Sequence, residues 1–399
     1  MSVADLIQRL DVDWVSVLDD HDRRRVLQAC DRLKAKLETP MDTTARLAFS
    51  AHQAMAVRLG IDMKLFDAMA KVGQSTGSFK VQDLCEETGS DPLLVRRIIR
   101  FLAAMGVIKE TDDSYIPTPL AAAYVSTSPL SAGVIHSTHF LTVLSRLPEY
   151  FHANGWKSPD DGLNGPFQFA LGTDSHYFDF LGTHPYYQQA FNTVMTLSFR
   201  RRGKDWFEFF PAEERLRASS NTDPLIVDVG GGLGEDLKKF KERFSALPGK
   251  LILQDLPAVI EGAKDLPVGI EAQSHDFFQK QPVRDAKAYF MRTVLHDWPD
   301  RQAVQILGKL RDAMNNDSIL LISETMLPES GVLLPSVISD MQMMGSFASL
   351  ERTQEQWQTL LETAGFELVH VWLPDDCDRS PASLAEQPAL LEARVRRSP

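Results

Sequence analysis

The second half of the chain alternates between short apolar runs and longer stretches with the periodicity of amphipathic helices. Six of the runs have the length and composition of strands, and helical patterns lie between the first four and at 353–364. These runs span residues 225–229, 251–254, 288–291, 319–323, 367–372 and 390–395. The alternation predicts an α/β fold with a doubly wound, Rossmann-like sheet, whose ligand lies at the carboxyl ends of the strands.

Residues 1–125 show a different pattern, in which helical periodicity dominates. Met1 leads into an amphipathic helix, and residues up to about 73 continue as apolar-periodic helices. Such helices cannot bury their apolar faces within so small a segment, which predicts packing against a second subunit. We therefore expect residues 1–125 to form a helical dimerisation domain and the chain to form a homodimer.

The end of this segment, residues 79–125, has the pattern of a winged helix. A short helix at 81–88 is followed by Gly89-Ser90-Asp91-Pro92, a turn that caps the next helix and starts it with proline. That helix spans 93–105, and a small hairpin at 107–110 and 115–117 completes the motif. The apolar side chains that we expect on one side of the second helix are Leu94, Ile98, Phe101 and Leu102.

A winged helix serves either as a DNA-binding module or as a dimerisation module of the same shape. In the hairpin, Lys109 is followed by Glu110, Asp112 and Asp113, which repel phosphates. The whole chain has 42 basic and 54 acidic residues, a formal net charge of −12. This balance argues against a general affinity for nucleic acid or for an anionic membrane, so we favour dimerisation.

Residues 126–210 are helical and rich in aromatic side chains, and we expect them to line the substrate. His136 and His139 share one helix face, but no partner glutamate of the HExxH type accompanies them, so we predict no metal. An aromatic stripe is usually core, although part of this one suits a wall for a flat, apolar substrate. The predicted substrate contacts are His136, His139, Phe178, Met195, Asp297, Met343 and Phe347.

Composition excludes several further classes of protein. No apolar run is long enough to span a bilayer, and no signal peptide of the charged-then-apolar kind follows Met1. The three cysteines, Cys30, Cys85 and Cys377, have neither metal nor disulfide spacing. We expect a cytoplasmic protein whose 399 residues bury large cores, with the catalytic domain at 211–399.

The first strand of the second half ends in a glycine-rich turn, Gly230-Gly231-Gly232-Leu233-Gly234. Glycines let the backbone approach a ligand closely and adopt positive φ, and a helical pattern follows the turn. On its own this signal is weak, because several nucleotide-binding families share it. The residues after the turn, Glu235 and Asp236, would repel a triphosphate, so a phosphate-binding P-loop is excluded.

Two acidic positions further along the chain narrow the ligand to an adenosine. Asp255 ends the second strand, where a carboxylate accepts hydrogen bonds from ribose hydroxyls. Asp276 offers an acceptor to an adenine amino group, and Phe277 beside it offers a face on which the base stacks. The predicted cofactor is S-adenosylmethionine, with NAD as the alternative.

The segment that follows the third predicted strand carries the candidate reactive group, in the sequence Leu295-His296-Asp297-Trp298. His296 lies just past the carboxyl end of a strand, and its ordinary pKa near neutrality suits a general base. The alternative is a buried histidine with a structural role.

Taken together, these motifs resemble the S-adenosylmethionine-dependent O-methyltransferases of the plant caffeate and flavonoid type, whose fungal members modify polyketides and other phenols. The resemblance covers nearly the whole chain. It rests on residues 227–234, Asp255-Leu256-Pro257, Asp276-Phe277, Leu295-His296-Asp297-Trp298, residues 323–328 and Glu351-Arg352-Thr353.

The resemblance implies roles for particular residues. It assigns the general base to His296, framed by Glu324 and Glu351, and it implies methylation of a phenolic hydroxyl. It also implies a dimer in which one subunit's N-terminal segment sometimes reaches the other's substrate site. With Arg292 in place of the family's usual lysine, the predicted cofactor contacts are Asp228, Gly230, Gly231, Gly232, Asp255, Asp276, Phe277 and Arg292.

Two departures from the family pattern bear on the substrate. A Gly-Gly element that usually precedes Glu-Arg-Thr is replaced by Phe347-Ala348-Ser349-Leu350, and residues 374–387 are longer and richer in Pro and Ser. Some fungal relatives keep the fold but catalyse dehydration or pericyclic rearrangement, generally with an altered catalytic histidine. Here His296 is intact, so O-methylation is the first hypothesis and such repurposed chemistry, assisted by His136 and His139, is the second.

Overall fold

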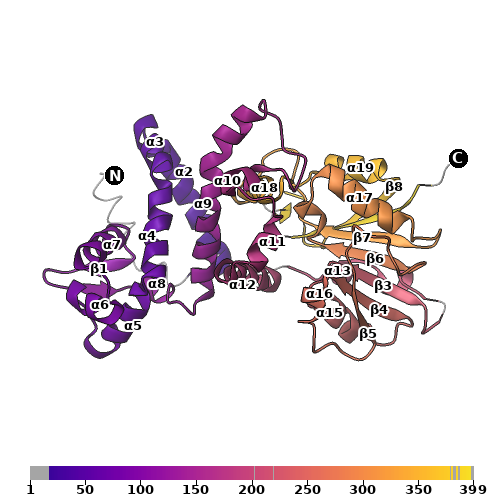
Figure 1. Cartoon of the computed structure of the whole chain (residues 1–399), viewed down its shortest axis with the longest axis horizontal. Coiled ribbons are helices and arrows are strands. Elements are labelled where there is room, and N and C mark those ends of the chain that lie inside the picture. The colour runs from indigo at the N-terminus through magenta and orange to yellow at the C-terminus, as the bar shows by residue number, and fades with distance from the viewer. Residues whose placement is uncertain are drawn as a thin grey trace. The chain divides into compact units, whose positions relative to one another are not determined.

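The computed structural model of the chain describes residues 18–396, except for 202, 219, 378, 381, 382, 385 and 386 (Figure 1). It divides into two compact units, Met1–Ser126 and Thr127–Pro399, which we describe separately. The helix predicted after Met1 lies outside the described residues, and the 374–387 segment is described only in part.

The described part of the N-terminal unit begins with three helices, of which the first two have side-chain caps. They are α2 (Asp20–Leu37), α3 (Pro40–Ala48) and α4 (Ser50–Asp62). The Asp19 carboxylate accepts the Asp22 N–H at 2.8 Å, and Thr39 forms a capping box with Asp42, so each side chain satisfies free amides at a helix start. The predicted helical periodicity of this region is confirmed over the described residues.

The remainder of this unit has the predicted winged-helix shape. Its elements are α5 (Leu65–Thr76), α6 (Val81–Thr88), α7 (Pro92–Ala104), β1 (Ile108–Glu110), β2 (Tyr115–Pro117) and α8 (Pro119–Ala122). β1 and β2 pair antiparallel, with Lys109 opposite Ile116. Asp91 caps α7 by accepting the Leu94 N–H at 2.9 Å, and Pro92 occupies the first turn, as the sequence predicts.

The buried face of α7 differs from the predicted one. The side chains that it buries are Val95, Ile98, Ile99 and Leu102. Leu94 and Phe101 are instead 43% and 38% exposed, so half of the predicted face was wrong. The error arises because apolar residues occupy both sides of this helix, and periodicity alone does not say which side meets the core.

The second unit begins with helices that precede the sheet. They are α9 (Pro129–Ala153), α10 (Pro166–Leu171), α11 (Tyr177–Gly182), α12 (Pro185–Arg201), α13 (Trp206–Phe209) and α14 (Ala212–Arg215). The long helix α9 packs against α10 and α12, and also against α18 (Leu334–Phe347) from the far end of the sequence. Aromatic side chains of the helices before the sheet therefore meet residues that follow its fifth parallel strand.

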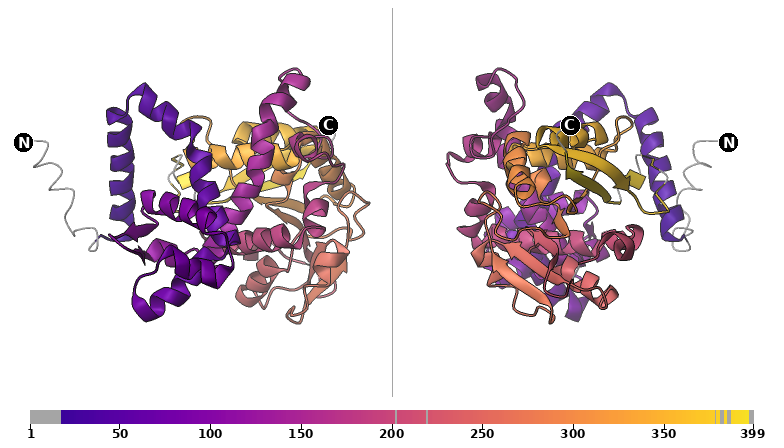
Figure 2. Two further views of the ribbon diagram at one scale, coloured as in Figure 1. Left: turned by 60° about the vertical axis from the view of Figure 1, so that its left-hand side comes forward. Right: turned by 90° about the vertical axis from the view of Figure 1, so that its right-hand side faces the viewer.

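Seven strands form one sheet in the order β5-β4-β3-β6-β7-β9-β8. Their bounds are β3 (Pro224–Val229), β4 (Lys250–Asp255), β5 (Ile270–Ser274), β6 (Ala288–Arg292), β7 (Ile319–Glu324), β8 (Phe366–Trp372) and β9 (Ala389–Val395). The first five are parallel, and β9 pairs antiparallel with both β7 and β8. The predicted α/β class is confirmed, and Figure 2 shows the strands from two further directions.

Helices cover both faces of this sheet, as the doubly wound prediction requires. The covering helices and turns are α15 (Glu235–Arg243), α16 (Pro257–Ile260), η2 (Leu295–Asp297), α17 (Asp300–Arg311) and α19 (Gln354–Thr363). One core joins Tyr289 and Ile322 to residues of α17 and α19, and the other joins Phe290 to Trp206 and Phe240 on α13 and α15. Because successive strand residues face opposite sides, each strand contributes to both cores.

Neither a membrane-spanning helix nor a metal-binding cluster is present in the part of the chain that the structure describes. No helix there combines the length and apolar character needed to cross a membrane. No three His, Cys, Asp or Glu side chains there converge in a geometry that would hold a metal ion.

Candidate active site

The glycine turn after β3 has no room for a Cβ atom at Gly230 or Gly231. Gly230 and Gly232 have φ of +73° and +61°, which disfavours any residue with a Cβ atom. A Cβ atom on Gly231 would lie 2.5 Å from the Asp228 carboxyl group. The turn therefore requires glycine for both backbone conformation and space.

Asp255 lies beside this turn at the end of β4. Its Oδ2 accepts the Gly232 N–H at 2.8 Å and its Oδ1 accepts the Leu256 N–H at 2.7 Å. Burial raises the pKa of the Asp255 carboxyl group, and these two backbone hydrogen bonds oppose the rise. The carboxylate is thus fixed in orientation next to the backbone that the glycines expose.

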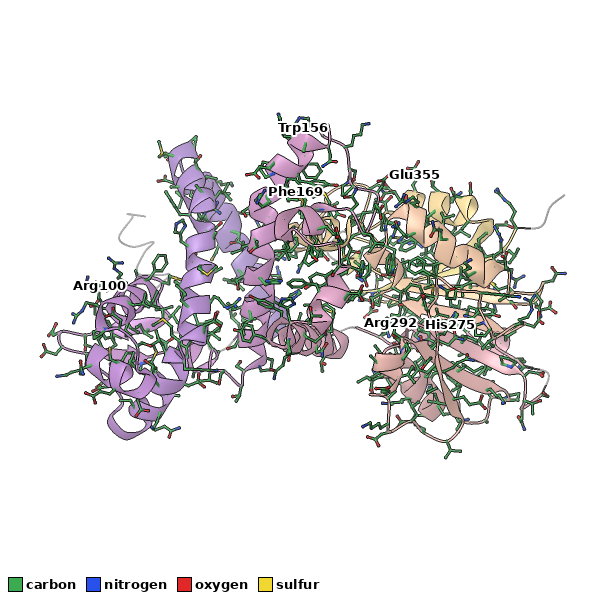
Figure 3. The ribbon with its side chains drawn as sticks, in the orientation of Figure 1. Arg100, Trp156, Phe169, His275, Arg292 and Glu355 are labelled. Carbon is green, nitrogen blue, oxygen red and sulfur yellow. The ribbon has the colours of Figure 1, made fainter. Side chains whose placement is uncertain are left out.

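Asp228 and Arg292 bring unsatisfied polar atoms to the same end of the sheet. Asp228 is 1% exposed, its Oδ2 has no hydrogen-bond partner among the described residues, and burial raises its pKa well above the usual range. Arg292 (Figure 3) forms an ion pair with Asp236, yet its Nε and Nη2 atoms have no partner there. Since buried polar groups are normally paired, these atoms fit a ligand with both an ammonium and a carboxylate group.

Asp276 and Phe277 follow β5. The Asp276 Oδ1 atom accepts the Phe278 N–H at 2.9 Å, which fixes the turn. A Cβ atom on Gly230 would lie 3.8 Å from the Phe277 ring, so this ring borders the glycine turn. The structure thus brings the predicted cofactor residues to one end of the sheet, and their roles stay predictions.

His296 lies in the 3₁₀ turn η2, directly after β6. The Glu324 Oε1 atom, at the end of the neighbouring strand β7, accepts the N–H groups of Val294, Leu295 and His296 at 3.1, 3.1 and 3.3 Å. Thr293, which starts the turn, has φ of +47°. Glu324 therefore holds the backbone that carries the imidazole, which is a role distinct from contact with the ring itself.

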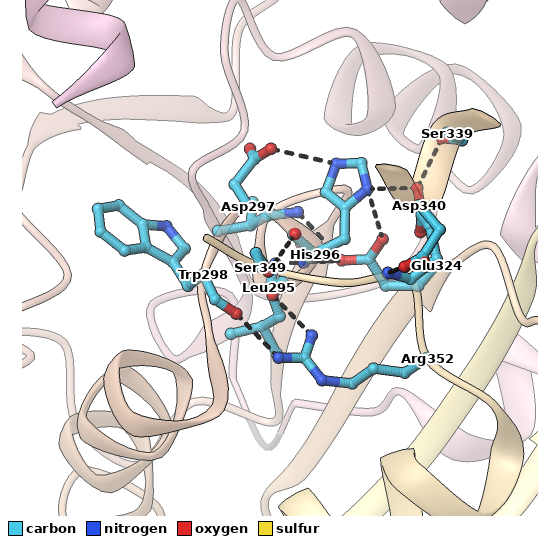
Figure 4. Close-up of polar contacts among 11 residues, drawn as sticks. Leu295, His296, Asp297, Trp298, Glu324, Ser339, Asp340, Ser349 and Arg352 are labelled. Carbon is cyan, nitrogen blue, oxygen red and sulfur yellow. Dashed lines mark hydrogen bonds and ion pairs between the residues drawn. The ribbon is translucent and has the colours of Figure 1, made fainter. Parts of the chain in front are cut away.

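Arg352 holds the same turn through its carbonyl groups (Figure 4). Its guanidinium is fully buried and donates to the Leu295 and Trp298 carbonyl oxygens at 2.9 and 2.8 Å. It also donates to Asp300 Oδ1 at 2.7 Å. Because Glu324 binds the amides and Arg352 the carbonyls, the turn is fixed by side chains of both charges.

Three carboxylates surround the His296 ring. Its Nδ1 atom lies 3.3 Å from Glu351 Oε1 and 4.0 Å from Glu324 Oε2. Its Nε2 atom lies 3.5 Å from Asp297 Oδ1, and the side chain remains 19% exposed. Glu324 and Glu351 thus both face Nδ1, and Asp297 faces Nε2.

This crowding changes the acid–base properties of the cluster. Burial disfavours the imidazolium, but the carboxylates of Glu324, Asp297 and Glu351 more than offset it and raise the pKa of His296 to about 10. Burial raises the pKa of Asp297 to about 7, although His296 opposes the rise. The pKa of Glu351 is lowered, because hydrogen bonds and the facing imidazole outweigh its burial.

Three of the predicted substrate contacts share one aromatic cluster. Its buried members are Phe140, Val143, Phe167, Tyr177, Leu181 and Phe347, with Phe178 and Met343 packed against them. The rings of Phe178 and Phe347 lie 5.2 Å apart. Next to them, the His176 ring stacks on Trp298 at 4.7 Å, so aromatic packing continues to the turn that carries His296.

The remaining predicted contacts lie in different surroundings. His136 is paired with Gln342 of α18, with 3.0 Å between Nε2 atoms, and burial lowers its pKa. His139 stacks on Tyr187 at 3.8 Å and so contributes to packing between α9 and α12. Met195 is 42% exposed and is not part of the aromatic cluster. The structure therefore does not bring Met195 together with the others.

Comparison with known proteins decides the family. A family model for an O-methyltransferase domain matches residues 160–367, and one for an O-methyltransferase dimerisation domain matches residues 45–127. The chain belongs to the O-methyltransferase family. The resemblance drawn from the motifs is thereby confirmed, and the matched ranges include both the winged-helix unit and the site around His296.

Individual relatives of this O-methyltransferase come from fungi. It is 34% identical to O-methyltransferase mfmE of Annulohypoxylon moriforme, over 92% of each chain. It is 31% identical to demethylsterigmatocystin 6-O-methyltransferase of Aspergillus parasiticus, over 88% of this chain and 90% of that one.

Two solved structures are also similar to this chain along nearly its whole length. The O-methyltransferase matches LepI in complex with SAM with a TM-score of 0.78 and 30% identity, over 99% of this chain and 98% of that one. It also matches a structure described as a pericyclic reaction enzyme, with a TM-score of 0.79 and 30% identity, over 98% and 99% of the two chains. The fold is therefore shared with a protein solved with SAM bound and with one described as a pericyclic reaction enzyme.

Sequence reasoning missed several residues of this site. Arg352 stood inside a quoted motif without a role, although a charged residue between Glu351 and a helix cap was a visible signal. Ser339 and Asp340 contact Glu351, and Ser349 donates to the His296 carbonyl oxygen at 2.6 Å. Ser349 belongs to the segment in which the chain departs from its family, so that departure reaches the turn of the base itself.

Proposed function

We propose that this O-methyltransferase uses S-adenosylmethionine to methylate a hydroxyl of a phenolic or polyketide-type small molecule, with His296 as the general base. The setting of the imidazole carries the proposal. Glu351 Oε1 lies 3.3 Å from Nδ1, while Nε2 faces Asp297 Oδ1 at 3.5 Å and the side chain as a whole is 19% exposed. A base oriented in this way accepts the proton of a hydroxyl placed against Nε2.

The cofactor residues fit S-adenosylmethionine. We assign Asp255 to the ribose hydroxyls, and Asp276 with Phe277 to adenine. The unsatisfied atoms of Asp228 and Arg292 suit the ammonium and carboxylate groups of the methionine part. When bound, the cofactor supplies an electrophilic methyl group on a positively charged sulfur. The similarity to a protein solved in complex with SAM supports this assignment.

The carboxylates around His296 explain how the chain assists the reaction. As the hydroxyl proton moves to Nε2, positive charge develops on the imidazole, and Glu324 and Glu351 already face it. The raised pKa of His296, about 10, is close to the value of ~10 for a phenol such as tyrosine. Proton transfer between the two groups is then nearly thermoneutral.

The direct test is incubation of the purified chain with S-adenosylmethionine and a panel of phenolic polyketides. We expect product heavier by one methyl group and one equivalent of S-adenosylhomocysteine, both read by mass spectrometry. Absence of methylated product across a broad panel, with cofactor binding intact, would contradict the proposal.

A second candidate is a pericyclic rearrangement or dehydration of a polyketide-derived substrate. It is favoured by the similarity to a described pericyclic reaction enzyme. The hydrogen-bonded pair of His136 and Gln342, in which burial lowers the pKa of the imidazole, also favours it. This reaction gives an isomeric or dehydrated product and no S-adenosylhomocysteine. The same mass-spectrometric assay therefore separates the two candidates.

We further propose a homodimer in which residues 1–125 form the dimerisation domain, 126–210 line the substrate and 211–399 hold the cofactor. The dimerisation-domain match supports it. So do Leu37, Met41 and Leu47, which are 72%, 76% and 62% exposed on α2 and α3. Light scattering should give twice the chain mass, and deletion of residues 1–73 should give insoluble or inactive protein. A monomeric and fully active truncation would contradict the proposal.

A further inference from the structure

Glu351, which faces the proposed general base, forms hydrogen bonds with two consecutive residues of α18. The Ser339 hydroxyl donates to Glu351 Oε1 at 2.9 Å. Asp340 Oδ1 accepts the Glu351 backbone N–H, also at 2.9 Å. One residue therefore fixes the side chain and the next fixes the backbone.

Ser339 and His296 share a single oxygen atom. Glu351 Oε1 receives the Ser339 hydroxyl at 2.9 Å and lies 3.3 Å from His296 Nδ1, whereas Glu351 Oε2 has no hydrogen-bond partner among the described residues. Glu351 itself is 5% exposed, so solvent only weakly screens its interactions with Ser339 and His296. The more strongly the serine hydroxyl binds Oε1, the less negative charge that oxygen offers to the imidazole.

We infer that Ser339 is a positioning residue that sets the basicity of His296 through Glu351. The inference rests on the proposed role of His296 as the base. The Ser339 hydrogen bond lowers the pKa of Glu351, because a donor stabilises the ionised carboxylate more than the protonated one. By moderating the carboxylate, it limits how far the imidazolium is stabilised and so enlarges the fraction of neutral imidazole at neutral pH.

Other charged groups near the His296 ring also influence its basicity. The Asp297 carboxyl group faces Nε2, Glu324 faces Nδ1 at 4.0 Å, and Asp340 lies on α18 beside Glu351. Arg352 favours the ionised forms of both glutamates. All four remain when Ser339 is replaced, so the variant changes one hydrogen bond within an otherwise constant field.

The test is the Ser339→Ala variant of the full chain. We expect the pKa of His296 to rise by about half a unit, the scale of one hydrogen bond to a charged group shared between two donors. At neutral pH kcat/KM should then fall about threefold, and the loss should vanish at alkaline pH, where the base is deprotonated in both proteins. The KM for S-adenosylmethionine should not change.

Two control variants keep the test specific. Ser339→Thr retains the hydroxyl and should restore the wild-type pH profile. Ser336→Ala removes a buried serine one turn earlier on α18 and should leave the profile unchanged. A loss of activity that is equal at every pH would overturn the inference, because it would show a purely structural role.

The pKa of His296 can also be measured without turnover, from the pH dependence of its ring resonances in the ligand-free protein. An upward shift in Ser339→Ala supports the inference even if no phenol is methylated, so failure of the proposed function would be recognised separately. An unchanged or lowered pKa would overturn the inference, since Ser339 would then not compete with His296 for Glu351.

Discussion

The glycine turn after β3 and the turn that carries His296 are built in opposite ways. The glycine turn is local, because positive φ at Gly230, Gly232 and Gly234 shapes the backbone within one short stretch. The other turn depends on partners far along the chain, with Glu324 28 residues and Glu351 55 residues from His296. The comparison teaches that the backbone conformation of the glycine turn is encoded within one short motif, whereas the setting of His296 is assembled from separate elements of the fold.

The sharpest way to separate the two regions is the His296→Ala variant. Loss of the general base should reduce turnover by about a hundredfold or more. The affinity for S-adenosylmethionine should stay within about threefold of wild type, because the glycine turn does not depend on His296. Steady-state kinetics and isothermal calorimetry on the same preparation measure both quantities.

A matched control is His370→Ala, which removes an exposed histidine of β8. It should leave both turnover and affinity unchanged. Full methyltransferase activity of His296→Ala would remove this residue from the mechanism.

The cofactor side is tested by Asp255→Ala. We expect S-adenosylmethionine to bind about 1.5–3 kcal/mol more weakly, which is the scale of hydrogen bonds to a charged group. Asp255 also holds the Gly232 amide, so the glycine turn loses an anchor at the same time. Calorimetric affinity is the measurement, and Asp265→Ala removes the same charge from an exposed position as the control. Unchanged affinity would show that Asp255 does not contact the cofactor.

The same contrast explains how much could be predicted from the sequence. The glycine turn, Asp255 and the strand ends were found because each is a local pattern of residue types. Strand β5 was missed, since it is an edge strand whose residues are mostly exposed and its sequence, Ile270–Ser274, has no apolar run. An edge strand is defined by its neighbour β4 more than by its own composition.

For the residues around His296, the sequence predicted their identity but not their individual contacts. His296 was proposed from its place after a strand, and Glu324 and Glu351 were named through family resemblance, but the different contacts that the two glutamates make were not predicted. That Glu324 binds three amides, and that Arg352 binds the carbonyls of the same turn, follows from how β6, β7 and the chain before α19 meet. No spacing in the sequence encodes such a meeting, because the partners belong to separate elements.

The pH dependence of stability should distinguish the two regions as well. The folded-state pKa of His296, about 10, lies above its unfolded value near 6.5. Its stabilising contribution is therefore complete below about pH 6.5 and is lost as pH rises from there through about 10. The melting temperature of the ligand-free protein should fall across this interval, and the fall should be shallower in His296→Gln. Equal slopes in both proteins would show that the carboxylate cluster does not hold an imidazolium.

The smallest expected effect couples the two regions directly. S-adenosylmethionine would bring a second positive charge towards a cluster that already holds imidazolium, and like charges lower each other's tendency to stay protonated. Binding at about pH 8 should therefore release up to one proton, seen as a dependence of the calorimetric enthalpy on the ionisation enthalpy of the buffer. S-adenosylhomocysteine has no sulfonium charge and should release much less. If both ligands release the same amount, the cofactor and the base do not interact electrostatically, and the two turns act independently.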